Sequence, residues 1–111
     1  MSNSNNIKDA FILDLVNSLN GDQRVELAEK YINKELISVF KDQELRSCID
    51  AFFTNNLNIS ETSRNTYMHR NTLIYRIDKI HKLTGLNIRD YHDAVTFYVL
   101  EHIYELTKNL R

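Results

Sequence analysis

The residues most suited to chemistry lie between positions 60 and 79, and their side chains donate hydrogen bonds or carry positive charge. Arginine and asparagine form paired hydrogen bonds with guanine and adenine edges, a threonine methyl group can meet the thymine methyl group, and lysine holds phosphates. If residues 70–84 form a helix, the side chains of this kind on its outward side and flank are Arg70, Asn71, Thr72, Tyr75, Arg76 and Lys79. These residues form the candidate DNA-binding group.

A second group of polar residues precedes this helix and is suited to phosphate contact: Ser60, Thr62, Arg64 and His69. Ser60 has the side chain of an N-cap and is expected to begin a short helix near 60–67. His69 stands before the helix 70–84, where its ring can cap free backbone amides, touch a phosphate or simply be exposed. All three roles of His69 stay open at this level.

Some of these residues also have interpretations that involve the protein alone. Arg76 can pair with a carboxylate such as Asp90 or Asp93 instead of a phosphate, and Tyr75 can lie flat on the protein surface. Cys48 falls within an apolar stripe, and we interpret it as a small buried hydrophobic residue instead of a reactive thiol.

Charge is segregated along the chain, although the formal net charge is only −1. The window 64–89 holds six basic residues and one acidic residue, Asp78, and so carries +5, whereas the rest of the chain carries −6. A basic block within an acidic chain is typical of a surface that binds a polyanion. The alternative is a solvated helix face that serves solubility.

Composition and motifs exclude several classes of protein. The chain has no proline and only two glycines, which favours an all-α fold over a sandwich or barrel of short strands. Its single cysteine forms no internal disulfide, and this cysteine and the four histidines have spacings that build no four-ligand zinc site. Because there is no glycine-rich phosphate loop, nucleophile elbow or His-Glu-x-x-His helix, we expect no enzyme, metal or cofactor and identify no small-molecule site.

The first residues are polar, and no apolar run approaches the roughly 20 residues that span a bilayer. We therefore expect a cytoplasmic protein without a membrane partner.

Helical spacing of apolar residues predicts about six helices. The first is expected over 7–20, with Asn20-Gly21 as its stop. Asp22 is expected to cap a second helix that runs to about residue 40 and has Tyr31 in its buried stripe.

The later helices follow from the same spacing. A third carries an apolar stripe from Leu45 to Phe53, and the last is capped by Asp90 and buries Tyr98 and Tyr104. The strongest periodicity predicts the helix 70–84, which would bury Leu73, Ile77 and Ile80 and be capped by Gly85. Together with the short helix before it, this helix has the spacing of a helix-turn-helix pair.

The residues of this pair closely resemble the C-terminal helix-turn-helix domain of the PucR/CdaR family, which are bacterial transcription regulators of purine catabolism and sugar-diacid use. The residues that carry the resemblance are Thr62-Ser63, His69-Arg70-Asn71-Thr72-Leu73, Tyr75-Arg76, Leu83-Thr84-Gly85 and Asp90. A weaker similarity begins near Leu27, and the whole extends to about Tyr98. The resemblance implies a DNA-binding output domain in which Thr62 opens the supporting helix and the matching recognition-helix positions are Arg70, Asn71, Thr72, Tyr75 and Arg76.

Two positions depart from the family pattern. Ser63 and Thr66 stand where the family commonly has alanine and leucine, so the supporting helix is expected to pack less well and any buried hydroxyl needs a partner. Family members usually carry a large N-terminal sensory region, and the chain is accordingly expected to be either a fragment or a stand-alone binder.

The sequence thus predicts an all-α, Fis/PucR-like helix-turn-helix without a wing, preceded by a helical extension. The expected divisions are a disordered polar tail over 1–6, a helical segment for packing or dimerisation over 7–56, and a DNA-binding domain over 57–111. The expected function is sequence-specific regulation by a homodimer that binds double-stranded DNA through the helix 70–84 in the major groove. The alternative is a helical protein–protein interaction module whose basic face meets an acidic partner.

Overall fold

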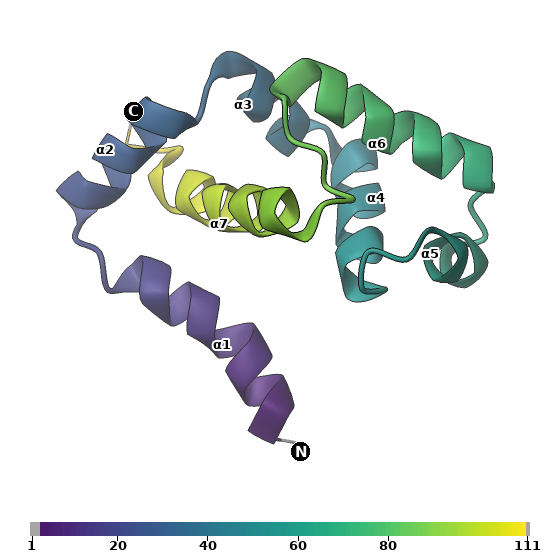
Figure 1. The fold of residues 1–111 in the computed structure, drawn as a ribbon. Helices are drawn as coiled ribbons and strands as arrows, with labels where there is room; N and C mark the ends of the chain where they lie inside the picture. The colour runs from purple at the N-terminus through teal and green to yellow at the C-terminus, as the bar shows by residue number, and fades with distance from the viewer. Residues whose placement is uncertain (1–2, 111) are drawn as a thin grey trace. The chain divides into compact units, whose positions relative to one another are not determined.

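The computed structural model describes residues 3–110, and within this range the chain forms seven α-helices and no strand (Figure 1). The expected all-α fold is confirmed, with one helix more than the six expected. None of the described helices is long and apolar enough to cross a membrane.

The helices divide between two compact units. The terminal unit comprises the chain up to Asn33 and from Tyr98 onward, and it contains α1 (Asn3–Asn17), α2 (Gly21–Tyr31) and the second part of α7 (Tyr91–Thr107). The central unit, Lys34–Phe97, contains α3 (Lys34–Lys41), α4 (Gln43–Thr54), α5 (Ile59–Thr66), α6 (Arg70–Thr84) and the first part of α7. The domain boundaries expected from the sequence stay predictions, and residues 1 and 2 of the expected tail lie outside the described range.

In the terminal unit, Asn20-Gly21 begins a helix and does not end one. The Asn20 side chain accepts a hydrogen bond from the Gln23 amide at 2.8 Å, and the Gln23 side chain accepts one from the Asn20 amide at 2.9 Å. This capping box satisfies two backbone N–H groups at the start of α2. The expected stop at Asn20-Gly21 and the expected cap at Asp22 are therefore wrong, because the Asn20 side chain serves the following helix and Asp22 lies inside its first turn.

The helix expected over 22–40 is interrupted between α2 and α3. Ile32 has an extended backbone (φ −100°, ψ 102°) and is buried, whereas Tyr31, expected in the core, is 52% exposed. Ala28, Ile32 and Leu36 are all buried and follow one another at intervals of four residues. Because this helical spacing continues through the interruption, periodicity alone predicts one helix where the chain forms two.

Aromatic and aliphatic side chains form the core of the central unit. Phe97 of α7 packs edge to face against Phe40 of α3 and Phe53 of α4, with ring centroids 5.2 and 6.2 Å apart. The predicted apolar stripe of α6 is buried against this core, with at most 1% of any side chain exposed: Leu73, Ile77 and Ile80. Burial of each such side chain contributes roughly 1.5–3 kcal/mol, so the stripe determines which side of α6 faces outward.

Both caps expected in the later part of the chain are confirmed. Gly85 ends α6 with a left-handed backbone (φ 81°), and its amide donates to the His81 carbonyl oxygen at 2.8 Å. Asp90 precedes α7 and its carboxylate accepts a hydrogen bond from the His92 amide at 2.9 Å. In the terminal unit, Tyr104 is buried as expected and Tyr98 is half-buried.

The short helix α5 is capped by Asn58 and not by Ser60 as expected. The Asn58 side chain accepts a hydrogen bond from the Glu61 amide at 2.8 Å, whereas Ser60 lies within the first turn of the helix. Asparagine and serine are about equally good N-caps, and the chain takes the earlier of the two because residues 56 and 57 already turn it with positive φ angles of 58° and 60°.

This cap gives a direct test of the fold. We expect Asn58→Ala to lower the free energy of unfolding by about 1 kcal/mol, because the Glu61 amide loses its acceptor. The matched variant Ser60→Ala is expected to change it by less than about 0.5 kcal/mol, since Ser60 is exposed and caps nothing. Urea unfolding followed by circular dichroism compares the two, and a larger effect of Ser60→Ala would contradict the observed cap.

Candidate nucleic-acid interface

Helices α5 and α6 pack against each other and are joined by a turn of three residues (Figure 1). Tyr67 reverses the chain with a left-handed backbone (φ 57°, ψ 22°). The Ser63 hydroxyl donates to the Met68 carbonyl oxygen, and the Thr66 hydroxyl donates to the carbonyl four residues earlier and accepts from the Met68 amide. The two residues that depart from the family pattern thus have partners for their hydroxyls, in Met68 of the turn and in the backbone of α5.

One side of α6 is polar and open to solvent. Asn71, Thr72, Tyr75 and Lys79 are all exposed, and 68% of Tyr75 is accessible, so its ring does not lie flat on the protein. The stripe on the opposite side of the helix is buried. The outward orientation that the sequence predicted for these four side chains is therefore present in the fold.

The first turn of α6 is connected to α5 by side chains. Arg70 donates from Nη1 to Ser60 Oγ at 2.8 Å, and both residues are exposed. His69 is the N-cap of α6, and its Nδ1 accepts a hydrogen bond from the Asn71 amide at 3.1 Å. Three roles were left open for His69. The structure shows that it caps a backbone amide while its side chain remains exposed, and phosphate contact stays a prediction.

The remaining two candidates for phosphate contact lie in α5 and differ in exposure. Thr62 is completely buried, and its hydroxyl donates to the Asn58 carbonyl oxygen at 2.7 Å. Because the Thr62 side chain is part of the core, the expectation that it contacts a phosphate is wrong. Arg64 is exposed and forms an ion pair with Glu61 one turn earlier.

Arg76 pairs with an acidic residue that the sequence did not indicate. Its Nη2 forms an ion pair with Glu44 of α4, and its Nη1 lies 3.9 Å from Met68 Sδ. The expected carboxylate partners, Asp90 and Asp93, accept hydrogen bonds from backbone amides in and next to the first turn of α7. The expectation that a carboxylate of the protein can pair with Arg76 is therefore correct, but this carboxylate is Glu44 and not Asp90 or Asp93.

Cys48 of α4 is buried and free, as expected. Burial raises the pKa of its thiol above the ordinary value near 9.0, and the neighbouring Arg76 guanidinium acts in the opposite direction. A thiol of this kind is protonated at neutral pH and is a packing group.

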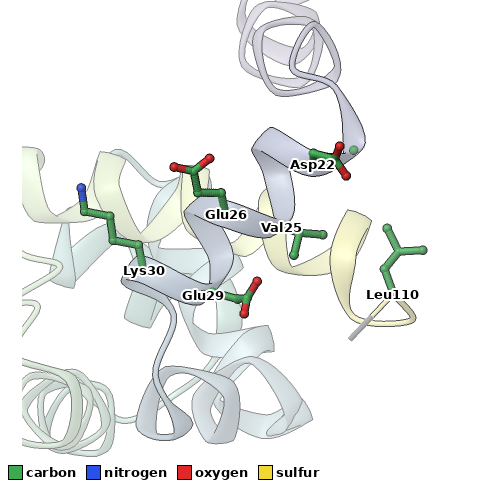
Figure 2. Close-up of a pocket in the computed structure, with 7 residues that line it drawn as sticks. Asp22, Val25, Glu26, Glu29, Lys30 and Leu110 are labelled. Atoms are coloured by element: carbon green, nitrogen blue, oxygen red, sulfur yellow. The ribbon is translucent and has the colours of Figure 1, made fainter.

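A groove of about 760 Å³ lies on the terminal unit, which contains none of the predicted site residues. Its lining includes Asp22, Glu26 and Glu29 of α2, with Lys30 on the same helix and Leu110 after α7 (Figure 2). Three carboxylates against one ammonium group make this surface unsuited to a polyanion.

The arrangement of α5, the turn and an outward polar face on α6 defines a helix-turn-helix domain. A family model described as the PucR C-terminal helix-turn-helix domain matches residues 45–103, just over half of the chain. The chain belongs to this family, as its resemblance in the turn and in α6 indicated. No solved structure matches significantly.

Two relatives with descriptive names match over most of this chain. The carbohydrate diacid regulator of Escherichia coli is 36% identical over 93 residues, which is 83% of this chain and 24% of the relative. The purine catabolism regulatory protein of Bacillus subtilis is 36% identical over 70 residues, 60% of this chain and 13% of the relative. The chain thus spans about a quarter or less of the length of the curated relatives that it matches.

Sequence reasoning missed two residues at this site. Glu44 stands 32 positions before Arg76, and no local pattern links residues so far apart in different helices. Tyr67 is 95% exposed at the turn between α5 and α6, yet it stands outside both apolar stripes. From the sequence, Tyr67 was placed at the end of the predicted helix 60–67, whereas in the structure it follows α5 with a left-handed backbone that its residue type does not indicate.

The pKa direction of Cys48 can be tested because the chain has no other cysteine. The thiolate is the species that reacts with iodoacetamide, so we expect alkylation at pH 8 to be at least roughly tenfold slower in the folded chain than in urea. In the unfolded chain the rate should be half-maximal near pH 9.0 and level off about one pH unit higher, whereas in the folded chain it should continue to rise beyond that point. Mass spectrometry of quenched samples measures both rates, and equal rates at pH 8 would contradict a buried thiol.

Proposed function

We propose that this chain is the DNA-binding domain of a sequence-specific transcription regulator, with α6 in the major groove of double-stranded DNA and α5 supporting it. The observation that carries the proposal is the exposure of Asn71, Thr72, Tyr75 and Lys79 along the side of α6 opposite its buried stripe. Family membership and relatives named as regulators support the same function.

The side chains of α6 that we assign to DNA contact each match a chemical group in DNA. Arg70, in the first turn, suits the paired acceptors of guanine, and Asn71 suits the donor and acceptor of adenine. Thr72 and Tyr75 offer apolar and hydroxyl contacts to base edges, and Lys79, two turns further along, suits a phosphate. Because the first turn carries both paired hydrogen-bonding groups, we place the N-terminal half of α6 deepest in the groove.

The proposed backbone contacts come from the supporting helix and from the turn. Ser60, Arg64 and His69 are exposed and can approach phosphates on either side of the groove. The hydrogen bond between Ser60 and Arg70 holds the arginine next to α5 before DNA is bound. Thr62 takes no part, because its side chain is buried.

One such module reads only a few base pairs, so useful affinity requires two copies on half-sites about 34 Å apart. We therefore propose that the regulator binds DNA as a homodimer. In a bacterium this activity belongs to the cytoplasm, where the DNA is.

Selection of bound duplexes from a random pool tests the proposed function. We expect an enriched site with two-fold symmetry and a spacing of about one helical turn between its halves. Affinity for the selected duplex should fall steeply with salt, because each neutralised phosphate contributes a slope of about −0.9 in a log–log plot. No enrichment, and no binding at about 50 mM salt, would instead favour a module that binds an acidic protein.

Substitutions in the first turn of α6 test the base-reading roles. Asn71→Ala is expected to weaken binding to the selected duplex by roughly 1–3 kcal/mol and to relax the preference at one position. Arg70→Lys keeps the charge but loses the paired hydrogen bonds, so it should lose discrimination at its base while largely keeping the salt slope. Fluorescence anisotropy with labelled duplexes measures these affinities.

The matched control for Asn71→Ala is Asn109→Ala, which changes the same side chain at an exposed position of the terminal unit. We expect this control to bind like the unaltered chain. If Asn71→Ala and Asn109→Ala have equal affinity and equal base preference, Asn71 does not read a base.

A further inference from the structure

The ion pair between Arg76 and Glu44 connects α6 to a helix outside the helix-turn-helix pair. Glu44 lies in the first turn of α4, and only 22% of the Arg76 side chain is exposed compared with 71% of the Glu44 side chain. The guanidinium also contacts Met68 in the turn and lies beside the Cys48 thiol of α4. Arg76 therefore has three neighbours within the protein, two on α4 and one in the turn.

These contacts lie at the edge of the polar face of α6. A groove of about 300 Å³ between α4 and α6 is lined by Asp42, Glu44 and Leu45 on one side and by Thr72, Tyr75, Arg76 and Lys79 on the other. Thr72, Tyr75 and Lys79 are among the residues that we assign to DNA contact. The carboxylates of Asp42 and Glu44 thus lie directly beside the face of α6 that we propose binds DNA.

We propose that Glu44 is a specificity-determining residue that keeps Arg76 bound within the protein and away from DNA. Arg76 is then a positioning residue, which holds α6 against α4 and the turn, and not a contact to a base or a phosphate. This inference rests on the proposed function, and it departs from the family resemblance, which matches Arg76 to a recognition-helix position.

The physical argument concerns binding that is independent of sequence. An arginine at the edge of the groove that is free to reach a phosphate adds affinity for every duplex, and so lowers the ratio between specific and random sites. An arginine that is neutralised by Glu44 adds nothing to that background. The carboxylate also repels phosphates from the neighbourhood of Arg76, which leaves phosphate contact at this edge to Lys79 and base reading to the side chains of the first turn.

The experiment compares a selected duplex with a random-sequence duplex of equal length, both titrated with salt. In Glu44→Gln, Arg76 is released, so we expect about three- to tenfold tighter binding to the random duplex and a log–log slope steeper by about 0.9. The ratio of the two affinities should fall accordingly. Asp50→Asn is the matched control, because it removes one exposed carboxylate from the same helix without touching Arg76.

The reciprocal variant tests the role of Arg76 itself. We expect Arg76→Met to leave the salt slope unchanged, since the arginine is not a phosphate contact in the unaltered chain. Arg76→Lys keeps the positive charge facing Glu44 and should retain the affinity ratio of the unaltered chain. Circular dichroism of each variant shows that it is folded, and the neutral variant Arg76→Gln provides the slope measurement if Arg76→Met does not fold.

Three results would overturn the inference. One is a Glu44→Gln variant that has the same slope and random-duplex affinity as Asp50→Asn. The second is a slope that becomes shallower by about 0.9 in Arg76→Met, which would make Arg76 a phosphate contact. The third is an unaltered chain that binds neither duplex, and this result alone would also overturn the proposed function.

Discussion

The burial of one apolar stripe on α6 is the constraint on which the rest of the site depends. Leu73, Ile77 and Ile80 are enclosed by the core of the central unit, and together their burial is worth several kcal/mol. A rotation of α6 about its axis would expose these apolar side chains to water and bury polar ones in the core. Both changes raise the free energy of the folded state. The outward position of Asn71 and Tyr75 is therefore a consequence of packing and needs no ligand to produce it.

Polar contacts contribute less free energy than this burial, and they act on the arrangement of α5 and α6 that packing has already formed. Exposed ion pairs such as that of Arg64 with Glu61 contribute about 0–1 kcal/mol each. The hydrogen bond from Ser63 to Met68 and that from Arg70 to Ser60 connect α5 with the turn and with α6. Such contacts cannot decide whether the helices form, but they determine where the first turn of α6 lies relative to α5.

Sequence reasoning was most successful where the signal is local. Helix α6 was predicted with its observed ends because its apolar spacing, its glycine cap and the absence of proline agree. The predictions at Asn20, Asp22 and Ser60 were wrong because several good capping residues lie close together and propensity does not choose among them. The interruption at Ile32 was missed because the helical spacing of buried residues continues through it.

The candidate site was predictable to a similar degree. The exposed face of α6 follows from periodicity, and the role of His69 was among the possibilities considered. The partner of Arg76 was beyond reach, because Glu44 lies on another helix and the sequence contains fourteen other acidic residues. The burial of Thr62 also depends on tertiary packing, since an isolated α5 would expose much of this side chain.

Left-handed backbone bounds α5 on both sides at residues other than glycine, with Asn56 and Leu57 before the helix and Tyr67 after it. This conformation costs most L-residues about 1–2 kcal/mol, and within α5 only Ile59 and Thr62 are buried to offset it. We therefore expect α5 to open locally at a lower cost than α6, which buries three side chains, and its amides to exchange with solvent sooner than those of α6. A ligand that binds α5 must restrict this local opening, so substitutions in the two flanking turns are expected to change affinity without altering the exposed side chains of α6.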